Sequence, residues 1–121
     1  MGYTKPIDPS AIWRYINKTI EQNYGSVNAN SSTNVTISTT TKQLIFLHVK
    51  FDATSTDSYV TLRKNINGAW RILTKKYGDG AHEIYINFID ILDEYDLYIE
   101  FYNTHGTSKA YTYVLGRVDL D

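Results

Sequence analysis

The chain has 121 residues, the usual size of one domain and enough to bury a core without covalent crosslinks. It contains no cysteine, which excludes a disulfide scaffold and a thiolate metal site. Basic and acidic residues nearly balance at a formal net charge of -1, so the chain lacks the broad positive field that non-specific nucleic-acid binding needs.

An amphipathic helix is predicted near the N-terminus. Asp8-Pro9 is typical of a helix start, because the Asp side chain accepts from amide groups and Pro fits the first helical position. The apolar residues that follow share one helical stripe or lie beside it: Ile12, Trp13, Ile16, Ile20 and Tyr24. Gly25 fits a left-handed cap at the end. This helix either packs on the chain's own sheet or docks into a neighbouring subunit.

The segment before the helix is polar and has no long apolar run, so neither a secretory signal nor a membrane span is expected. The segment after it, from Ser26 to Asn34, is almost wholly small and polar and predicts an exposed linker. The expected organisation is a helical arm with a linker over residues 1–33 and a sandwich domain over residues 34–121.

Seven segments after the linker alternate apolar and polar residues, which indicates strands with one buried face. They lie at residues 35–37, 43–51, 58–66, 69–77, 84–88, 97–102 and 109–118. Asn67-Gly68 predicts a two-residue hairpin turn, since both positions need positive φ. The fold expected is all-β, an antiparallel β-sandwich of jelly-roll or immunoglobulin-like type with about seven or eight strands, preceded by the N-terminal helix.

The sequence leaves two features of this strand region undecided. Leu44 and Phe46 place apolar groups on the second face of the strongest strand, so a lid is expected there, and the N-terminal helix is the natural candidate. Residues 89–94 predict either one helical turn or a cap on the end of the sandwich.

Charge is segregated along the chain. All charged residues from Arg63 to Lys76 are basic, and all those from Asp79 to Glu100 are acidic. We expect two electrically distinct regions, which would let the basic edge of one copy meet the acidic edge of the next.

No catalytic, metal-binding or cofactor motif is found. His48, His82 and His105 lie in separate segments without a metal-ligand spacing, and Gly78-Asp79-Gly80 predicts a turn because no helix follows it to hold a phosphate. The acidic loop at residues 90–96 is a candidate calcium site, but it lacks the spacing of a calcium loop and is better explained as a solvated turn. The sequence predicts a non-enzymatic protein without a cofactor.

The 11 tyrosines are the residues with most potential for binding. Strand alternation places four on outward-facing positions: Tyr59, Tyr85, Tyr98 and Tyr102. Tyrosine combines a large contact area with a hydroxyl, which suits a protein interface or a sugar-binding platform. The plain alternative is that tyrosine favours half-exposed strands.

The absence of cysteine, the abundance of tyrosine and threonine, the polar N-terminal arm and the lack of an active-site motif resemble small β-sandwich structural proteins of phages and archaeal viruses. The resemblance implies a capsid, decoration, turret or tail component, assembled in the host cytoplasm and present in the virion. Its expected partners are copies of itself and other virion proteins. Assembly contacts are expected at the outward tyrosines and at Trp13, Ile16 and Ile20.

The second hypothesis for the function is a carbohydrate-binding module that uses the outward tyrosines. The third is a small enzyme with His48 or His82 beside a carboxylate.

Overall fold

A computed structural model describes residues 18–38, 42–93 and 96–119 as an all-β protein. Its eight strands, in chain order, are β1 (Lys18–Val27), β2 (Ser31–Ser38), β3 (Lys42–Phe51), β4 (Tyr59–Ile66), β5 (Ala69–Tyr77), β6 (Ile84–Asp93), β7 (Asp96–Asn103) and β8 (Lys109–Asp119). No helix long and apolar enough to cross a membrane occurs within these ranges.

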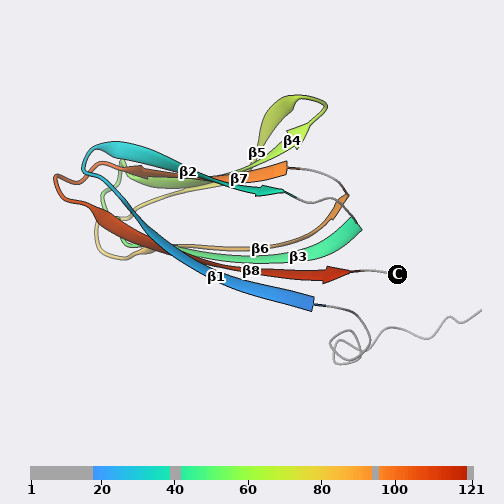
Figure 1. Ribbon diagram of the computed structural model, residues 1–121. Helices are drawn as coiled ribbons and strands as arrows, with labels where there is room; N and C mark the ends of the chain where they lie inside the picture. Colours follow the sequence, from blue (N-terminus) through green and yellow to red (C-terminus); the bar gives the residue numbers. More distant parts are fainter. Residues whose placement is uncertain (1–17, 39–41, 94–95, 120–121) are drawn as a thin grey trace, which may run out of the picture.

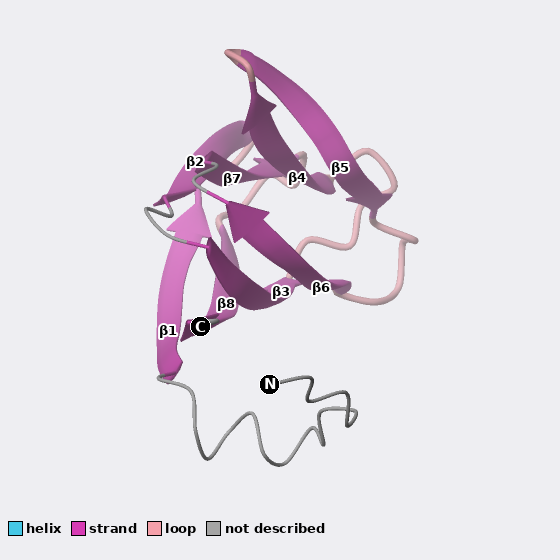
Figure 2. Cartoon of the chain, turned by 90° about the vertical axis from the view of Figure 1, so that its right-hand side faces the viewer, coloured by secondary structure: helices cyan, strands magenta, loops and turns pink. Residues whose placement is uncertain are grey.

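The strands form two antiparallel sheets that face each other (Figure 1). Sheet A has the order β1-β8-β3-β6 and sheet B the order β2-β7-β4-β5, and Figure 2 shows sheet B above sheet A. The first strand pairs with the last, the second with the second to last, and so on inward to the β4–β5 hairpin. A long hairpin rolled up in this way has jelly-roll connectivity, which confirms the predicted sandwich and selects between its two expected forms.

The core lies between the two sheets and is built by period-2 alternation. Odd-numbered residues of β3 and β7, among them Ile45, Leu47, Ile99 and Phe101, are almost fully buried. The Phe101 ring meets that of Phe51 edge-on at 5.2 Å between ring centroids. This leaves the even-numbered residues of these strands on the two outer faces.

The predicted N-terminal helix is wrong from residue 18 onward, because Lys18–Val27 is strand β1. All ten of its residues lie opposite residues of β8, and this pairing overrides the four-residue spacing of Ile16 and Ile20. Gly25 is therefore not a helix cap. The first part of the predicted helix lies outside the described residues.

The predicted linker is also wrong over residues 26–33, which belong to β1, β2 and the turn between them. Asn30 takes φ of 51° in that turn. Within the described residues the sheets begin at Lys18, and the part of the predicted arm before it stays a prediction.

Residues 89–93 continue β6 as a strand and form neither a helical turn nor a cap. The Asn67-Gly68 turn is confirmed, with φ of 54° and 83°.

Loops at one end of the sandwich are joined by buried polar groups. The Asn103 side-chain amide donates to the carbonyl oxygens of Val27, Asn28 and Thr107 at 2.9–3.2 Å, and its Oδ1 accepts from the amide of His105 at 2.9 Å. These bonds tie the β1–β2 turn to the β7–β8 loop.

The β3–β4 loop is tied to the same end of the sandwich. His105 Nε2 accepts from the backbone amides of Thr54 and Ser55 at 2.9 and 3.0 Å. Ser58, which is fully buried, exchanges hydrogen bonds with Thr104 through its hydroxyl. These hydrogen bonds hold the loops at this end of the sandwich in place relative to one another.

Two strand glycines predict responses of different size to one added methyl group. A Cβ on Gly25 would overlap the ring of Tyr111, which is stacked on Phe101 at 4.2 Å, whereas a Cβ on Gly116 would make an ordinary contact with Phe46 at 3.5 Å. We expect Gly25→Ala to lower the free energy of unfolding by about 2 kcal/mol through overpacking. Gly116→Ala should cost clearly less, because its Cβ meets Phe46 at an ordinary contact distance and overlaps no described atom. Urea denaturation of both variants checks this, and equal effects would contradict the packing described.

Candidate functional site

The outer face of sheet B carries a continuous set of aromatic and charged side chains, called here the aromatic face. Strand pairing aligns them in three rows. The first row holds Tyr77, Tyr59 and Tyr102, the second Lys75, Thr61 and Glu100, and the third Ile72, Arg63 and Tyr98. Trp70 lies beyond the third row, opposite Asn65 on the hairpin. In Figure 1 this part of the β4–β5 hairpin bends away from sheet A.

The aromatic rings of this face contact one another in tilted and edge-on pairs. Tyr59 lies 5.1 Å from Tyr102 and 5.8 Å from Tyr77 between ring centroids. Trp70 meets Tyr98 edge-on at 4.7 Å. Such pairs add roughly 0.5–1.5 kcal/mol each beyond the area they bury. The rings therefore hold one another in place, which lowers the entropy that a partner would have to remove on binding.

Two cations lie within this aromatic set. Lys75 Nζ is 4.1 Å from the ring centroid of Tyr59 and 5.0 Å from that of Tyr77, and the guanidinium of Arg63 is 5.8 Å from that of Tyr98. Arg63 also pairs with Glu100 at 3.8 Å. Cation–π contact orients the positive groups over the rings.

The charges of this face are well defined at neutral pH. Burial, followed by the nearby Glu100 carboxylate, raises the pKa of the Tyr59 hydroxyl. Hydrogen bonding with the Tyr77 side chain raises the pKa of Lys75. Tyr59 therefore stays neutral and Lys75 stays positive, so the face presents neutral rings around fixed cations.

Part of this face is exposed, and part has polar groups without hydrogen bonds. Tyr77 is 54% exposed, Ile72 53% and Trp70 40%. Thr61 Oγ1 and Arg63 Nε are buried and have no hydrogen-bond partner within the described part of the chain. Exposed apolar groups gathered in one place mark an interaction surface, and buried polar atoms without partners call for an explanation.

The predicted contact residues divide between the two faces of the molecule. The structure brings Tyr59, Tyr98 and Tyr102 together on sheet B. Tyr85 lies on the outer face of sheet A, with its ring 6.1 Å from that of His48. Ile20 is on β1, also on sheet A, and 62% exposed. Trp13 and Ile16 lie outside the described residues.

Sequence reasoning missed Trp70, Ile72 and Tyr77 as members of the aromatic face. The pairing of β4 with β5 shifts between Leu62 and Arg63, at a bulge. The bulge reverses the alternation along β5, so even-numbered Trp70 and Ile72 share a face with odd-numbered Lys75 and Tyr77. The sequence offered one signal, a tryptophan two residues after the Asn67-Gly68 turn.

The two charged regions of the sequence partly neutralise each other in the fold. The basic strand β4 lies beside the acidic strand β7, which produces the Arg63–Glu100 pair. Lys64 reaches across to Asp90 on the other sheet at 3.7 Å. Among the residues whose exposure the structure describes, the exposed lysines and arginine are Arg71, Lys75 and Lys76, all on the edge strand β5. Lysines on an edge strand also discourage unspecific strand pairing.

The histidines and acidic residues form no metal site within residues 18–38, 42–93 and 96–119, where no group of three or more metal-ligating side chains occurs. His48 Nδ1 contacts Asn87 Oδ1. His105 Nε2 is occupied by two backbone amides. Of the acidic residues predicted as a loop, Asp90 lies on strand β6 and forms an ion pair with Lys64.

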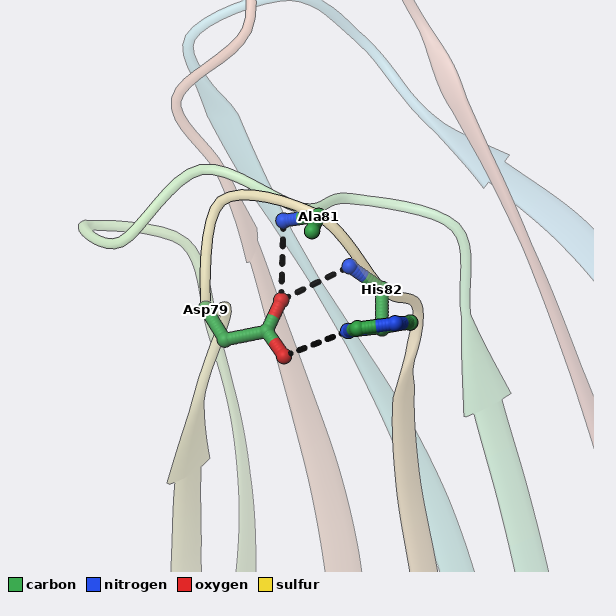
Figure 3. A network of polar contacts seen from close by, with 3 residues as sticks. All are labelled: Asp79, Ala81 and His82. Carbon is green, nitrogen blue, oxygen red and sulfur yellow. Dashed lines mark hydrogen bonds and ion pairs between the residues drawn. The ribbon is translucent and has the colours of Figure 1, made fainter.

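His82 does lie beside a carboxylate, on an exposed turn (Figure 3). Asp79 Oδ1 accepts from the amides of Ala81 and His82 at 2.9 and 2.7 Å, and Oδ2 lies 2.8 Å from His82 Nδ1. The backbone amides of His82 and Ala81, then the imidazole, lower the pKa of Asp79. Hydrogen bonding to Asp79 raises the pKa of His82. The arrangement closes a turn, and both side chains are exposed.

The pairing of His82 with Asp79 in this turn predicts how protein stability depends on pH. Because the folded pKa of His82 is raised, its contribution to stability is complete below the unfolded pKa near 6.5 and disappears as pH rises through the folded value. The Asp79 contribution is present above pH 3.8 and disappears as pH falls toward its lowered folded value. An NMR titration should place the His82 midpoint above that of a free imidazole, and Asp79→Asn should bring it down. An unchanged midpoint in Asp79→Asn would refute the pairing.

No protein-family model matches the sequence. No curated protein matches it either. Among solved structures, the chain is similar to the mitogen of Yersinia pseudotuberculosis, with a TM-score of 0.56, 13% identity, and coverage of 87% of this chain and 89% of that chain. It is also similar to a chain in the structure of infectious bursal disease virus, Gx strain, with a TM-score of 0.50, 12% identity, and coverage of 86% of this chain and 32% of that chain. The chain thus spans about a third of the viral one, and at these identities the likeness shows the fold alone.

Proposed function

We propose that this protein is a non-enzymatic structural subunit that self-associates through the aromatic face of sheet B. The observation that carries the proposal is the exposure of Trp70, Ile72 and Tyr77 together on one surface. Apolar groups gathered on a monomer are commonly covered by a partner. Aromatic residues and arginine are also the types enriched at the centres of interfaces.

The proposed setting is a virus particle, in which the subunit is a capsid, decoration, turret or tail component assembled in the host cytoplasm with other virion proteins. The jelly-roll order of the strands supports this, because that fold is frequent among capsid domains. The fold similarity to a chain of infectious bursal disease virus points the same way. The composition of the chain, without cysteine and rich in tyrosine, agrees with it.

The contact is head-to-tail in this proposal. Lys75, an exposed cation of the aromatic face on β5, would face the loops of the next copy in which Asp57, Asp79 and Glu83 are exposed. Such a heterologous contact closes into a ring or extends as a lattice. Added salt should weaken it, since the charges involved are at the surface.

The experiment that tests the proposal compares Tyr77→Ser with Tyr24→Ser by sedimentation velocity. Both tyrosines are exposed, but Tyr24 lies on β1 of the opposite sheet. Tyr77→Ser is expected to lower the association constant by about tenfold or more, a typical effect of a central interface residue. Tyr24→Ser should leave it unchanged. Equal behaviour of the two variants would exclude the aromatic face as the contact.

A second candidate function is carbohydrate binding, favoured by the clustering of Tyr59, Tyr98 and Tyr102 on one face. Aromatic rings bind the apolar faces of sugars. The tilted and edge-on arrangement of the rings offers a less continuous platform than coplanar rings would. A glycan array with binding that Tyr98→Ala and Tyr102→Ala abolish would favour this function over self-association.

A further inference from the structure

The outer face of sheet A contains a shallow hollow of about 250 Å³. One row of paired residues crosses all four strands beneath it: Ile20, Gly116, Phe46 and Ile89. Gly116 has no side chain, so the row is interrupted between Ile20 and Phe46, and the hollow opens there. Val114 and His48 of the next row help to line it.

The walls of this hollow are apolar and open to the surface. Ile20 is 62% exposed and Ile89 is 65% exposed. A cavity of about 150 Å³ holds one benzene molecule, and small-molecule sites measure about 300–1,000 Å³. The hollow therefore has room for one or two large apolar side chains, which fits a docked segment of protein better than a cofactor.

We propose that the hollow is the docking site of the N-terminal segment of the same chain, residues 9–17, with Ile12, Trp13 and Ile16 packed over Gly116. The segment joins the sheet next to the hollow. Ile20 is a wall of the hollow and lies only two residues after Lys18, where β1 starts. This inference does not depend on self-association through sheet B.

The length of the segment matches the width of the face it would cover. Nine residues in a helix span about 14 Å. Four strands separated by about 4.8 Å are also about 14 Å wide between the outermost axes. A helix that turns back at the start of β1 would therefore cross the sheet from β1 to β6. The stripe formed by Ile12 and Ile16 at helical spacing would then face the apolar row.

Glycine at position 116 gives independent support. It lies inside strand β8, where glycine weakens a strand, and a Cβ at this position would lie 3.5 Å from Phe46, so the sheet itself leaves room for a side chain. The φ angle of Gly116 is not positive, so the backbone conformation does not require glycine at this position. Glycine inside a strand often marks a place where another backbone approaches closely, and the proposed segment is such a backbone.

Disulfide trapping tests the contact in the full chain, which has no cysteine of its own. Ile12→Cys is combined with Phe46→Cys on β3, and the control combines Arg14→Cys, off the predicted stripe, with Phe46→Cys. Under mild oxidation the first pair is expected to form an intramolecular disulfide, faster than the control and at a rate independent of protein concentration. A disulfide between two chains, or no difference from the control, would overturn the proposal.

Tryptophan fluorescence gives a second measurement that needs no crosslink. In Trp70→Phe, Trp13 is the sole tryptophan. Its quenching by acrylamide should be several-fold weaker in the folded protein than in denaturant, and the added change Ile16→Asp should remove that protection. Equal quenching of Trp13 in the folded and unfolded protein would overturn the proposal even if the cysteine variants failed to fold.

Discussion

Replacing Asn103 with aspartate is expected to lower the free energy of unfolding by about 3–5 kcal/mol, the cost of a buried charge without a partner. The Asn103 amide donates to three carbonyl oxygens from two separate loops, and the residue is fully buried. Aspartate has nearly the same shape, but its carboxylate would face those carbonyls without a proton to donate. The β1–β2 turn and the β7–β8 loop would lose their link.

The pH dependence of this variant identifies the cause. Burial against carbonyl oxygens would raise the pKa of the new carboxyl above its unfolded value near 3.9. The loss of stability relative to the unchanged protein should therefore be smallest below about pH 4 and grow as pH rises toward the raised pKa. Asn34→Asp is the matched control, since Asn34 is exposed on β2, and should change stability by less than about 0.5 kcal/mol. A similar small effect at both positions would contradict the buried network.

Replacing Gly78 with alanine is expected to cost about 3 kcal/mol, at the upper end of overpacking effects. A Cβ at this position would overlap the backbone carbonyl of Ser55 and lie 2.6 Å from that of Thr54. Backbone cannot rotate away as a side chain can. The amides of the same two residues are held by His105, so the loop is fixed from its other side as well.

Gly106→Ala is the control for this prediction. Gly106 lies in the neighbouring β7–β8 loop, and nothing is within 4 Å of its would-be Cβ. We expect it to change stability by less than about 0.5 kcal/mol. Guanidinium denaturation at one fixed protein concentration compares the two variants. A Gly78→Ala protein as stable as Gly106→Ala would show that the β3–β4 and β5–β6 loops are not packed as described.

Local patterns made most of the fold predictable. Alternation over residues 43–51 identified β3 because the period of a strand is visible within a few residues. Asn67-Gly68 identified the central hairpin because its turn chemistry is local. Strand β1 was missed because Ile12, Ile16 and Ile20 lie four apart, as on a helix, while the pairing of Lys18–Val27 with β8 depends on residues about 90 positions away in the chain.

The candidate site was only partly predictable for a related reason. Tyr59, Tyr98 and Tyr102 were placed by alternation within β4 and β7, which are regular strands. Trp70 and Ile72 could not be placed, because the bulge in the β4–β5 pairing reverses the alternation along β5. Likewise, the basic and acidic runs gave no sign that β4 and β7 are neighbours, and therefore none of the Arg63–Glu100 pair.

The central claim is that this sandwich is a building unit whose aromatic face is covered by another copy. The native mass of the full chain, measured over a range of protein concentration at low and high salt, tests it most directly. We expect oligomers at low salt that dissociate on dilution and as salt is added. A mass equal to one chain of 13.9 kDa at every concentration and salt level would contradict the claim.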